Sequence, residues 1–332
     1  MNLEHRINLM VRLGEYMAGN DPAWVEARSR ASVENGWFTP EFIDKAVRSI
    51  VDGYLQRETL EALASDYPYL QEHHTPRKVG IVMAGNIPLV GFHDLLCVFL
   101  SGHIALIKPS SRDKVLLEHL VETLVSWVPE IADRIQFQEM LKHCDAYIAT
   151  GSNNSSRYFA YYFGKYPNII RKNRTSVGLL DGTETSEELD ALADDVHLYF
   201  GLGCRNITKI LVPEGYDFIP LLEAFKKYGY QGEHHKYKNN YDYNLALHIL
   251  NGNKYMSSGS LLLAENPSLF SPISQLNYEY YSNKEKMTAQ VLSNPDLQCL
   301  VGHGFTPFGQ AQCPGIRDFA DGIDTMAFLG GI

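Results

Sequence analysis

Short apolar runs alternate with segments of helical spacing between residues 79 and 149, and this alternation constrains the fold more than any other feature. The runs cover residues 79–83, 104–107 and 146–149, and each stops at a glycine, a lysine–proline pair or a polar turn. Residues 86–99 and 113–128, which lie between the runs, have apolar side chains at helical spacing. Strands that alternate with helices predict a parallel sheet with helices on both faces.

The pattern divides the chain into three parts. Residues 1–72 show helical periodicity, and we expect them to form a helical segment packed on the α/β domain that spans residues 73–180. Residues 181–332 repeat the mixture of strands and helices and close with a glycine-rich stretch that we expect to be mostly loop. The prediction is two mixed domains with a border near residue 180.

Composition removes several classes of function. The net charge of −10 provides no general electrostatic footprint for nucleic acid or anionic lipid. Five scattered cysteines do not form a disulfide framework, and Glu4 and Asn8 fall where a signal peptide needs an apolar core. His93 and Asp94 interrupt the longest apolar stretch, so it is a poor membrane span. We expect a cytoplasmic enzyme or ligand binder.

Polar residues follow each predicted strand of the first α/β domain. Asn86 follows residues 79–83, Lys108 ends the next strand, and Gly151 and Ser152 follow the third. Ligands of parallel sheets bind beyond the carboxyl ends of the strands. The amide of Asn86 can donate to a developing oxyanion, and asparagine is also common in plain turns. Lys108 is either a ribose or phosphate ligand or a solvated strand end.

Cys204 is the best single candidate for chemistry. Gly201 and Gly203 precede it and allow backbone or substrate to approach the sulfur closely, and Arg205 favours the thiolate. The alternative is a small buried residue in a tight turn. The glycine pair resembles half of a dinucleotide fingerprint, but Asn206 stands where the third glycine would be.

We predict no metal site. Cys299, His303 and Cys313 match no compact zinc spacing. The histidine pairs at 73–74 and 234–235 lie in polar stretches, which is typical of a solvated surface.

Five blocks in order resemble the aldehyde dehydrogenase superfamily and, within it, the LuxC-type acyl-CoA reductases. The blocks are residues 85–88, 107–110, 150–152, 203–215 and 307–317, and the resemblance extends from about residue 79 to residue 329. It implies an α/β fold of two domains, each with a mostly parallel sheet flanked by helices.

The resemblance also implies roles for individual residues. Cys204 would be the nucleophile, and Asn86 with the Cys204 backbone N–H would form the oxyanion hole. The implied contacts to the dinucleotide are Lys108, Ser110, Ser111, Arg112, Gly151 and Ser152.

Two departures from the family pattern are informative. Ile170 stands where ordinary aldehyde dehydrogenases carry a glutamate, and isoleucine cannot act as a general base. Such an enzyme would transfer its acyl group to or from a thiol rather than to water. Ser111 stands where NAD-preferring members often carry glutamate, and with Arg112 it tolerates a 2′-phosphate. We therefore expect NADPH, with NADH as the second possibility.

The expected function is reduction of acyl-CoA to an aldehyde through a cysteine acyl-enzyme. An aldehyde dehydrogenase or acyl-phosphate reductase on the same scaffold is the nearest alternative. A non-catalytic cofactor-binding protein with a degenerate site is the alternative from another class. The resemblance also implies an acyl-activating partner protein and a possible homodimer.

Overall fold

The computed structural model describes residues 1–72 and 75–332, and the chain forms two compact units. The first contains Met1–Asn173 and Pro314–Ile332, and the second contains Arg174–Cys313. The predicted border near residue 180 is therefore wrong by several residues, and the C-terminal segment belongs to the first unit. The predicted linker at 73–74, with its histidine pair, lies outside the described residues.

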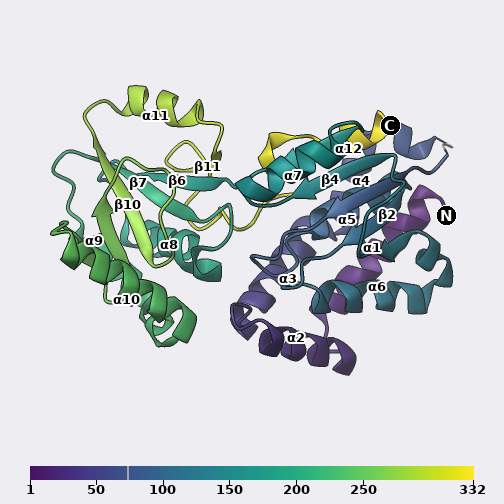
Figure 1. Ribbon diagram of the computed structural model, residues 1–332, viewed down its shortest axis with the longest axis horizontal. Coiled ribbons are helices and arrows are strands. Elements are labelled where there is room, and N and C mark those ends of the chain that lie inside the picture. The colour runs from purple at the N-terminus through teal and green to yellow at the C-terminus, as the bar shows by residue number, and fades with distance from the viewer. Residues whose placement is uncertain (73–74) are drawn as a thin grey trace. The chain divides into compact units, whose positions relative to one another are not determined.

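The first unit is built on a five-stranded parallel sheet of order β3-β2-β1-β4-β5. The strands are β1 (Lys78–Val82), β2 (Ile104–Lys108), β3 (Ile135–Phe137), β4 (Ala146–Thr150) and β5 (Asn168–Arg171). Helices α5 (Phe92–Ser101), α6 (Val115–Trp127) and α7 (Asn153–Phe163) connect them. Figure 1 shows α6 and α7 on opposite faces of the sheet, which confirms the predicted arrangement.

This strand order creates one switch point. The chain runs outward from β1 to β3 and then returns to β4 on the other side of β1. The connections after β1 and β4 therefore diverge, and parallel sheets bind ligands beyond the carboxyl ends of their strands at such a point.

Four helices precede the sheet and share its core. They are α1 (Leu3–Ala18), α2 (Pro22–Glu34), α3 (Pro40–Tyr54) and α4 (Arg57–Asp66). The side chains of Asn2, Asp21 and Thr39 cap the first three by accepting backbone N–H bonds. Their apolar faces pack in the same cluster as β1 and α5.

A buried ion pair ties the C-terminal segment to the first sheet. Arg171 Nη1 lies 2.5 Å from Asp94 Oδ2, and both side chains are less than 9% exposed. Arg171 Nη2 also donates to Thr325 Oγ1 at 2.9 Å. Thr325 begins α12 (Thr325–Gly330), a helix where the glycine-rich sequence predicted loop. These contacts explain why the segment returns to the first unit.

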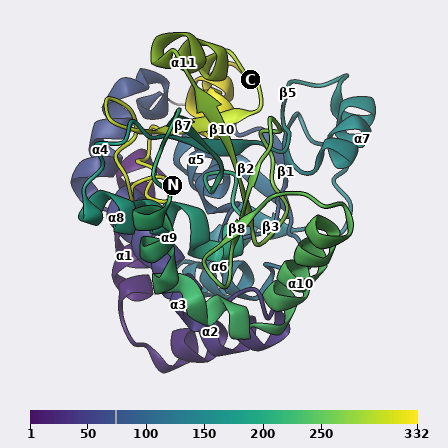
Figure 2. The ribbon, with the colours of Figure 1, turned by 90° about the vertical axis from the view of Figure 1, so that its left-hand side faces the viewer.

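The second unit has a six-stranded sheet of order β11-β6-β7-β10-β9-β8. Its strands are β6 (Thr175–Leu179), β7 (Ile207–Pro213), β8 (Met256–Ser257), β9 (Leu262–Glu265), β10 (Gln275–Tyr281) and β11 (Leu297–Gly302), and only β8 pairs antiparallel. Its helices are α8 (Ser186–His197), α9 (Ile219–Phe225), α10 (His235–Leu250) and α11 (Lys284–Leu292). Figures 1 and 2 show α11 on one face and α8 and α9 on the other, where they cover separate apolar clusters.

The described residues also form short 3-10 helices. They are η1 (Pro68–Gln71), η2 (Pro129–Asp133), η3 (Leu198–Gly201), η4 (Lys226–Glu233) and η5 (Ala320–Gly322). Within residues 1–72 and 75–332, the structure contains no helix with the length and apolarity needed to span a bilayer.

We expect Arg171→Met to lower the free energy of unfolding of the first unit by about 3–5 kcal/mol, because it leaves the Asp94 carboxylate buried without its partner. Urea unfolding followed by tryptophan fluorescence measures this directly, since Trp24, Trp37 and Trp127, the three tryptophans of the chain, all lie in that unit. Arg30→Met is the matched control because its pair with Glu34 is exposed. Equal losses in the two variants would contradict the prediction.

Candidate active site

Cys204 lies half-buried in the turn before β7, in the second unit. The chain reaches it through η3, where Tyr199 and Phe200 have φ of 55° and 56° and Gly201 has φ of 73°. A side chain disfavours this left-handed region, so the two aromatic residues hold a costly conformation. Surrounding contacts must therefore fix the loop.

Asn206 provides the main contacts that hold this loop. Its side chain is fully buried, and its Oδ1 accepts the backbone N–H of Gly203 at 2.8 Å. Its Nδ2 donates to the carbonyls of Leu198 at 2.8 Å and Asp195 at 3.1 Å. One amide thus joins both ends of the segment that presents Cys204. The asparagine that departs from the dinucleotide fingerprint is a structural anchor of the loop.

Two further side chains position the Cys204 loop and its neighbour. Ser176 Oγ, at the start of β6, donates to the Cys204 carbonyl at 3.2 Å. The buried carboxylate of Asp195 accepts the backbone N–H groups of Gly309 at 2.6 Å and Ala311 at 3.0 Å. Asp195 therefore connects the loop after β11 to the helix that leads into the Cys204 loop.

Burial separates Cys204 from Cys97 and Cys144 but not from Cys299. Cys97 and Cys144 are buried, and burial raises the pKa of both thiols, which disfavours the thiolate. Cys299 is half-buried within β11, and Cys313 is exposed. Cys204 is half-buried, so its thiol is less enclosed than those of Cys97 and Cys144.

In the first unit, the loops after β1 and β2 are in close contact. A Cβ on Gly85 would lie 2.4 Å from Ser110 Oγ, so only glycine permits this approach. The backbone N–H of Met83 donates to the Lys108 carbonyl at 3.1 Å. Asn86 is half-buried in the loop that Gly85 begins. The structure thus brings Asn86 and Ser110 to one edge of the sheet.

Asp113 lies against the loop that contains Asn86. It is buried, its Oδ1 has no hydrogen-bond partner, and its backbone N–H donates to the Ser110 carbonyl at 3.1 Å. Burial raises the pKa of Asp113 well above its usual range, and the nearby backbone N–H groups of Leu89 and Val90 oppose the shift. Leu89 has φ of 56°, so the loop is strained where Asp113 holds it. The sequence pattern does not mark Asp113 as functional, because a lone aspartate near a helix start is typical of a cap.

The remaining predicted cofactor residues occupy the same edge. Lys108 is the exposed last residue of β2, and Ser111 and Arg112 are exposed in the loop that follows. The Arg112 carbonyl accepts a bond from Asn35 Nδ2 at 3.1 Å, which connects this loop to the N-terminal helices.

The third segment follows β4, which pairs with β1. The polar turn predicted after this strand is shorter than expected, because α7 begins at Asn153. Ser152 is the N-cap of α7, and its hydroxyl accepts the Ser155 N–H at 3.2 Å. A Cβ on Gly151 would lie 2.9 Å from side-chain atoms of α7. Gly151 and Ser152 therefore stand beside the switch point at a helix N-terminus, where the dipole favours an anionic group.

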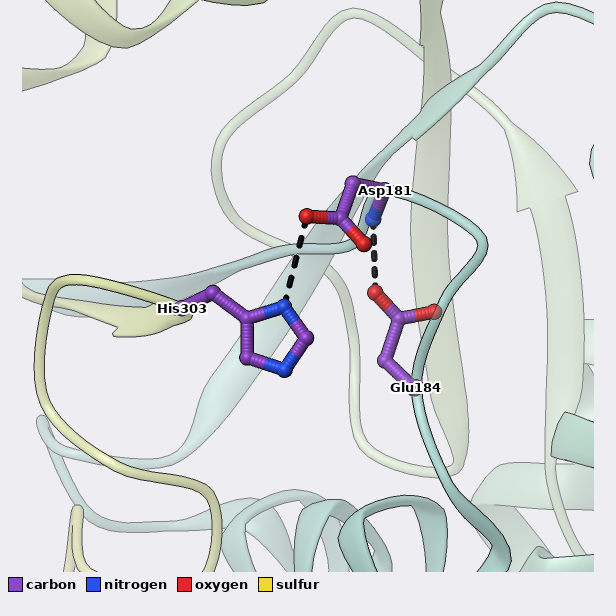
Figure 3. A group of neighbouring side chains, drawn as sticks. All are labelled: Asp181, Glu184 and His303. Atoms are coloured by element: carbon purple, nitrogen blue, oxygen red, sulfur yellow. Dashed lines mark hydrogen bonds and ion pairs between the residues drawn. The ribbon is translucent and has the colours of Figure 1, made fainter.

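A carboxylate–histidine cluster follows the carboxyl ends of β6 and β11 (Figure 3). It lies at the opposite end of the second sheet from Cys204, which precedes β7. His303 Nε2 lies 2.9 Å from Glu188 Oε1, and its Nδ1 lies 3.3 Å from Asp181 Oδ2. Lys284 Nζ is 2.7 Å from the same Asp181 oxygen, and the Asp181 N–H donates to Glu184 Oε1 at 2.6 Å. Lys284 and His303 already balance Asp181, so we describe the group as an ionic cluster that fastens the loop after β11.

Within this cluster the pKa of Asp181 is lowered and the pKa of His303 is raised. Burial alone would raise the pKa of Asp181, but hydrogen bonds from Lys284, Thr183 and His303 outweigh it and hold the pKa below its usual range. Hydrogen bonds to Glu188 and Asp181 raise the pKa of His303. Protonated His303 is therefore the form that the folded state stabilises.

Comparison with protein families gives one match. The family model described as acyl-CoA reductase (LuxC) matches residues 21–220, which is more than half of the chain. No curated protein matches the sequence at a significant level.

Solved structures share the fold over most of the chain. An oxidoreductase from Marinobacter aquaeolei is 10% identical, with a TM-score of 0.64 over 94% of this chain and 75% of that one. An NAD-dependent aldehyde dehydrogenase from Sinorhizobium meliloti is 12% identical, with a TM-score of 0.65 over 94% and 72%. An NADP-dependent enzyme from E. coli is 11% identical, with a TM-score of 0.66 over 91% and 73%. These likenesses establish an aldehyde dehydrogenase fold.

We expect His303→Gln to lower the melting temperature of the second unit at pH 6 and to leave it unchanged at pH 9. The folded-state pKa of His303 is raised, so its contribution is complete below the unfolded pKa of about 6.5 and disappears as the pH rises through the folded value. Calorimetric melting at the two pH values measures the effect, and the exposed His235→Gln is the control. A larger loss at pH 9 than at pH 6 would reverse the assigned sign.

Proposed function

Because the chain belongs to the acyl-CoA reductase (LuxC) family, we propose that Cys204 is the nucleophile that receives the acyl group from coenzyme A. The family makes the protein an oxidoreductase that acts on acyl-CoA. The observation that supports Cys204 is its half-exposed position in a loop that two buried side chains hold in place, those of Asn206 and Ser176.

The acyl-transfer step uses groups of this chain. The Cys204 thiolate attacks the thioester carbonyl, a new carbon–sulfur bond forms, and the bond to coenzyme A breaks as its thiolate leaves. Ile170, in β5, supplies no base to activate water. The acyl group on Cys204 is therefore protected from assisted hydrolysis, which favours a reductase over an aldehyde-oxidising enzyme.

Asn86 is the proposed side-chain donor to the oxyanion. An amide donor assists only if its position is fixed before the charge develops. Asp113 contributes to fixing the Asn86 loop, because its buried carboxyl group lies against the backbone N–H groups of Leu89 and Val90. The close approach of Gly85 to Ser110 holds the same loop from its other end.

A nicotinamide dinucleotide fits the carboxyl edge of the first sheet. The switch point, the exposed Lys108 and the N-terminus of α7 offer a crevice, a cation and a helix dipole for its phosphates. Ser111 and Arg112 are exposed and place no carboxylate against a 2′-phosphate, so we propose NADPH over NADH. When bound, the nicotinamide supplies the hydride that reduces the acyl group.

The proposal also includes the source of the acyl group. Acyl-CoA is the proposed acyl donor, and an acyl-activating partner protein is a second source of the acyl group. A free aldehyde or an acyl phosphate is the rival substrate on the same scaffold.

We expect Cys204→Ala to abolish acyl-CoA-dependent oxidation of NADPH, because the variant lacks the thiol that accepts the acyl group. Wild-type protein mixed with acyl-CoA alone should release one equivalent of free thiol, and the variant none. Cys313→Ala removes an exposed cysteine and should keep full activity. Parallel assays with NADH measure the cofactor preference. Turnover in Cys204→Ala would exclude this nucleophile, and activity on free aldehyde without thiol release would favour the rival.

We expect Asn86→Ala to lower kcat by about 10²–10³-fold, or about 2.7–4 kcal/mol of barrier, with little change in KM for acyl-CoA. The reason is that the amide acts on charge that develops only in the transition state. Steady-state kinetics measure the split, and Asn20→Ala, at an exposed position between α1 and α2, is the control. A rate near that of wild type would remove Asn86 from the site.

A further inference from the structure

Arg6 is a buried cation without a carboxylate partner among the described residues. Its side chain belongs to α1 and is 8% exposed. Nη1 donates to the Met1 carbonyl at 3.3 Å, Nη2 donates to the Leu70 carbonyl at 3.4 Å, and Nε has no partner. Buried charges in proteins are normally paired. Arg6 therefore lacks the counter-charge that its burial requires.

Arg134, a second arginine, adds to the uncompensated positive charge around Arg6. Burial lowers the pKa of Arg6, and repulsion from Arg134 lowers it further. Arg134 is half-buried, and its Nη1 donates to the Gly102 carbonyl at 3.3 Å. A Cβ on Gly102 would lie 2.6 Å from Arg6 Nη1, so both guanidinium groups contact this glycine.

Both arginines line one cavity of about 670 Å³, which we call the arginine cavity. Its other walls come from the first turn of α1, the end of α4 and the chain around Leu70. Small-molecule sites span this size range. Three carboxylates also contribute to the lining. Two of them, Glu4 and Glu61, bind Arg57 at 3.3 and 3.2 Å, and the third, Glu72, is exposed.

The arginine cavity is separate from the proposed cofactor edge. Pro76, Gly102 and Arg134 line it, and they precede β1, β2 and β3 respectively. The proposed cofactor residues lie at the carboxyl ends of β2 and β4. A five-residue strand spans about 16 Å, so a ligand in the arginine cavity lies at the opposite end of the sheet.

We propose that the arginine cavity binds an oxyanion, either a phosphate or a carboxylate group. Guanidinium groups present fixed N–H donors that match both anions, and the unpartnered Nε of Arg6 is one such donor. The anion supplies the counter-charge for Arg6 and relieves its repulsion from Arg134. The arginine cavity is separate from the proposed cofactor residues, so the bound anion takes no part in the reduction and acts as a regulatory ligand.

Calorimetric titration of the full chain tests this proposal. The probes are inorganic phosphate and octanoate, each compared with sodium chloride at equal ionic strength and with excess NADPH present. Arg134→Gln should weaken binding by about tenfold or more, as expected for loss of one charge-assisted hydrogen bond. Arg6→Lys should weaken it as well, because lysine lacks the planar fork of donors. Arg48→Gln makes the same charge change at an exposed position outside the lining and should bind as wild type does.

Each outcome bears on the proposal. Binding of phosphate alone identifies a phosphate-bearing ligand, binding of octanoate alone identifies a carboxylate, and either supports the site. Equal affinity in Arg134→Gln, Arg48→Gln and wild type would overturn it. So would the absence of binding beyond the chloride control. Arg134 is half-buried, so Arg134→Gln keeps the test valid if Arg6→Lys fails to fold.

Discussion

The fixed loops of this protein depend on buried side chains that satisfy backbone hydrogen-bonding groups. Asn206 does this for the segment around Cys204, and Asp195 does it for the segment after β11. The buried carboxyl group of Asp113 lies against the backbone of the Asn86 loop. A buried backbone group without a partner costs about 1–3 kcal/mol, so each anchor selects one loop conformation over many. Left-handed residues persist at Tyr199, Phe200 and Leu89 because these anchors oppose the strain.

The sequence pattern is sufficient to predict three of the five strands of the first sheet, β1, β2 and β4, and the polar residues at their ends, but it does not predict the short strands β3 and β5. Buried parallel strands are continuous apolar runs, and the residues that follow them must meet at one edge. Asn86, Lys108 and Gly151 were found by this rule. Their assembly at the carboxyl edge follows from strand order, which local pattern alone does not contain.

Other features depend on contacts between distant residues, so the sequence pattern does not contain them. The C-terminal segment is rich in glycine, which suggests loop, but Thr325 meets Arg171 and α12 packs on α5. Asn206 was interpreted as a missing glycine, and its value as an anchor appears only when its amide is seen between two ends of a loop. Arg6 was not noticed, because a single arginine in a helix usually lies at the solvated face.

The path of the chain through its two units has a consequence for biosynthesis. The second unit is inserted within the first, since the chain leaves the first unit at residue 173 and re-enters it at residue 314. On the ribosome, residues 174–313 emerge complete before α12 exists, so the second unit is free to fold first as a unit. Until then Asp94 and Arg171 lack the cover of the final helix. All five strands of the first sheet have then emerged, so the first unit has its complete sheet but not the helix that covers α5.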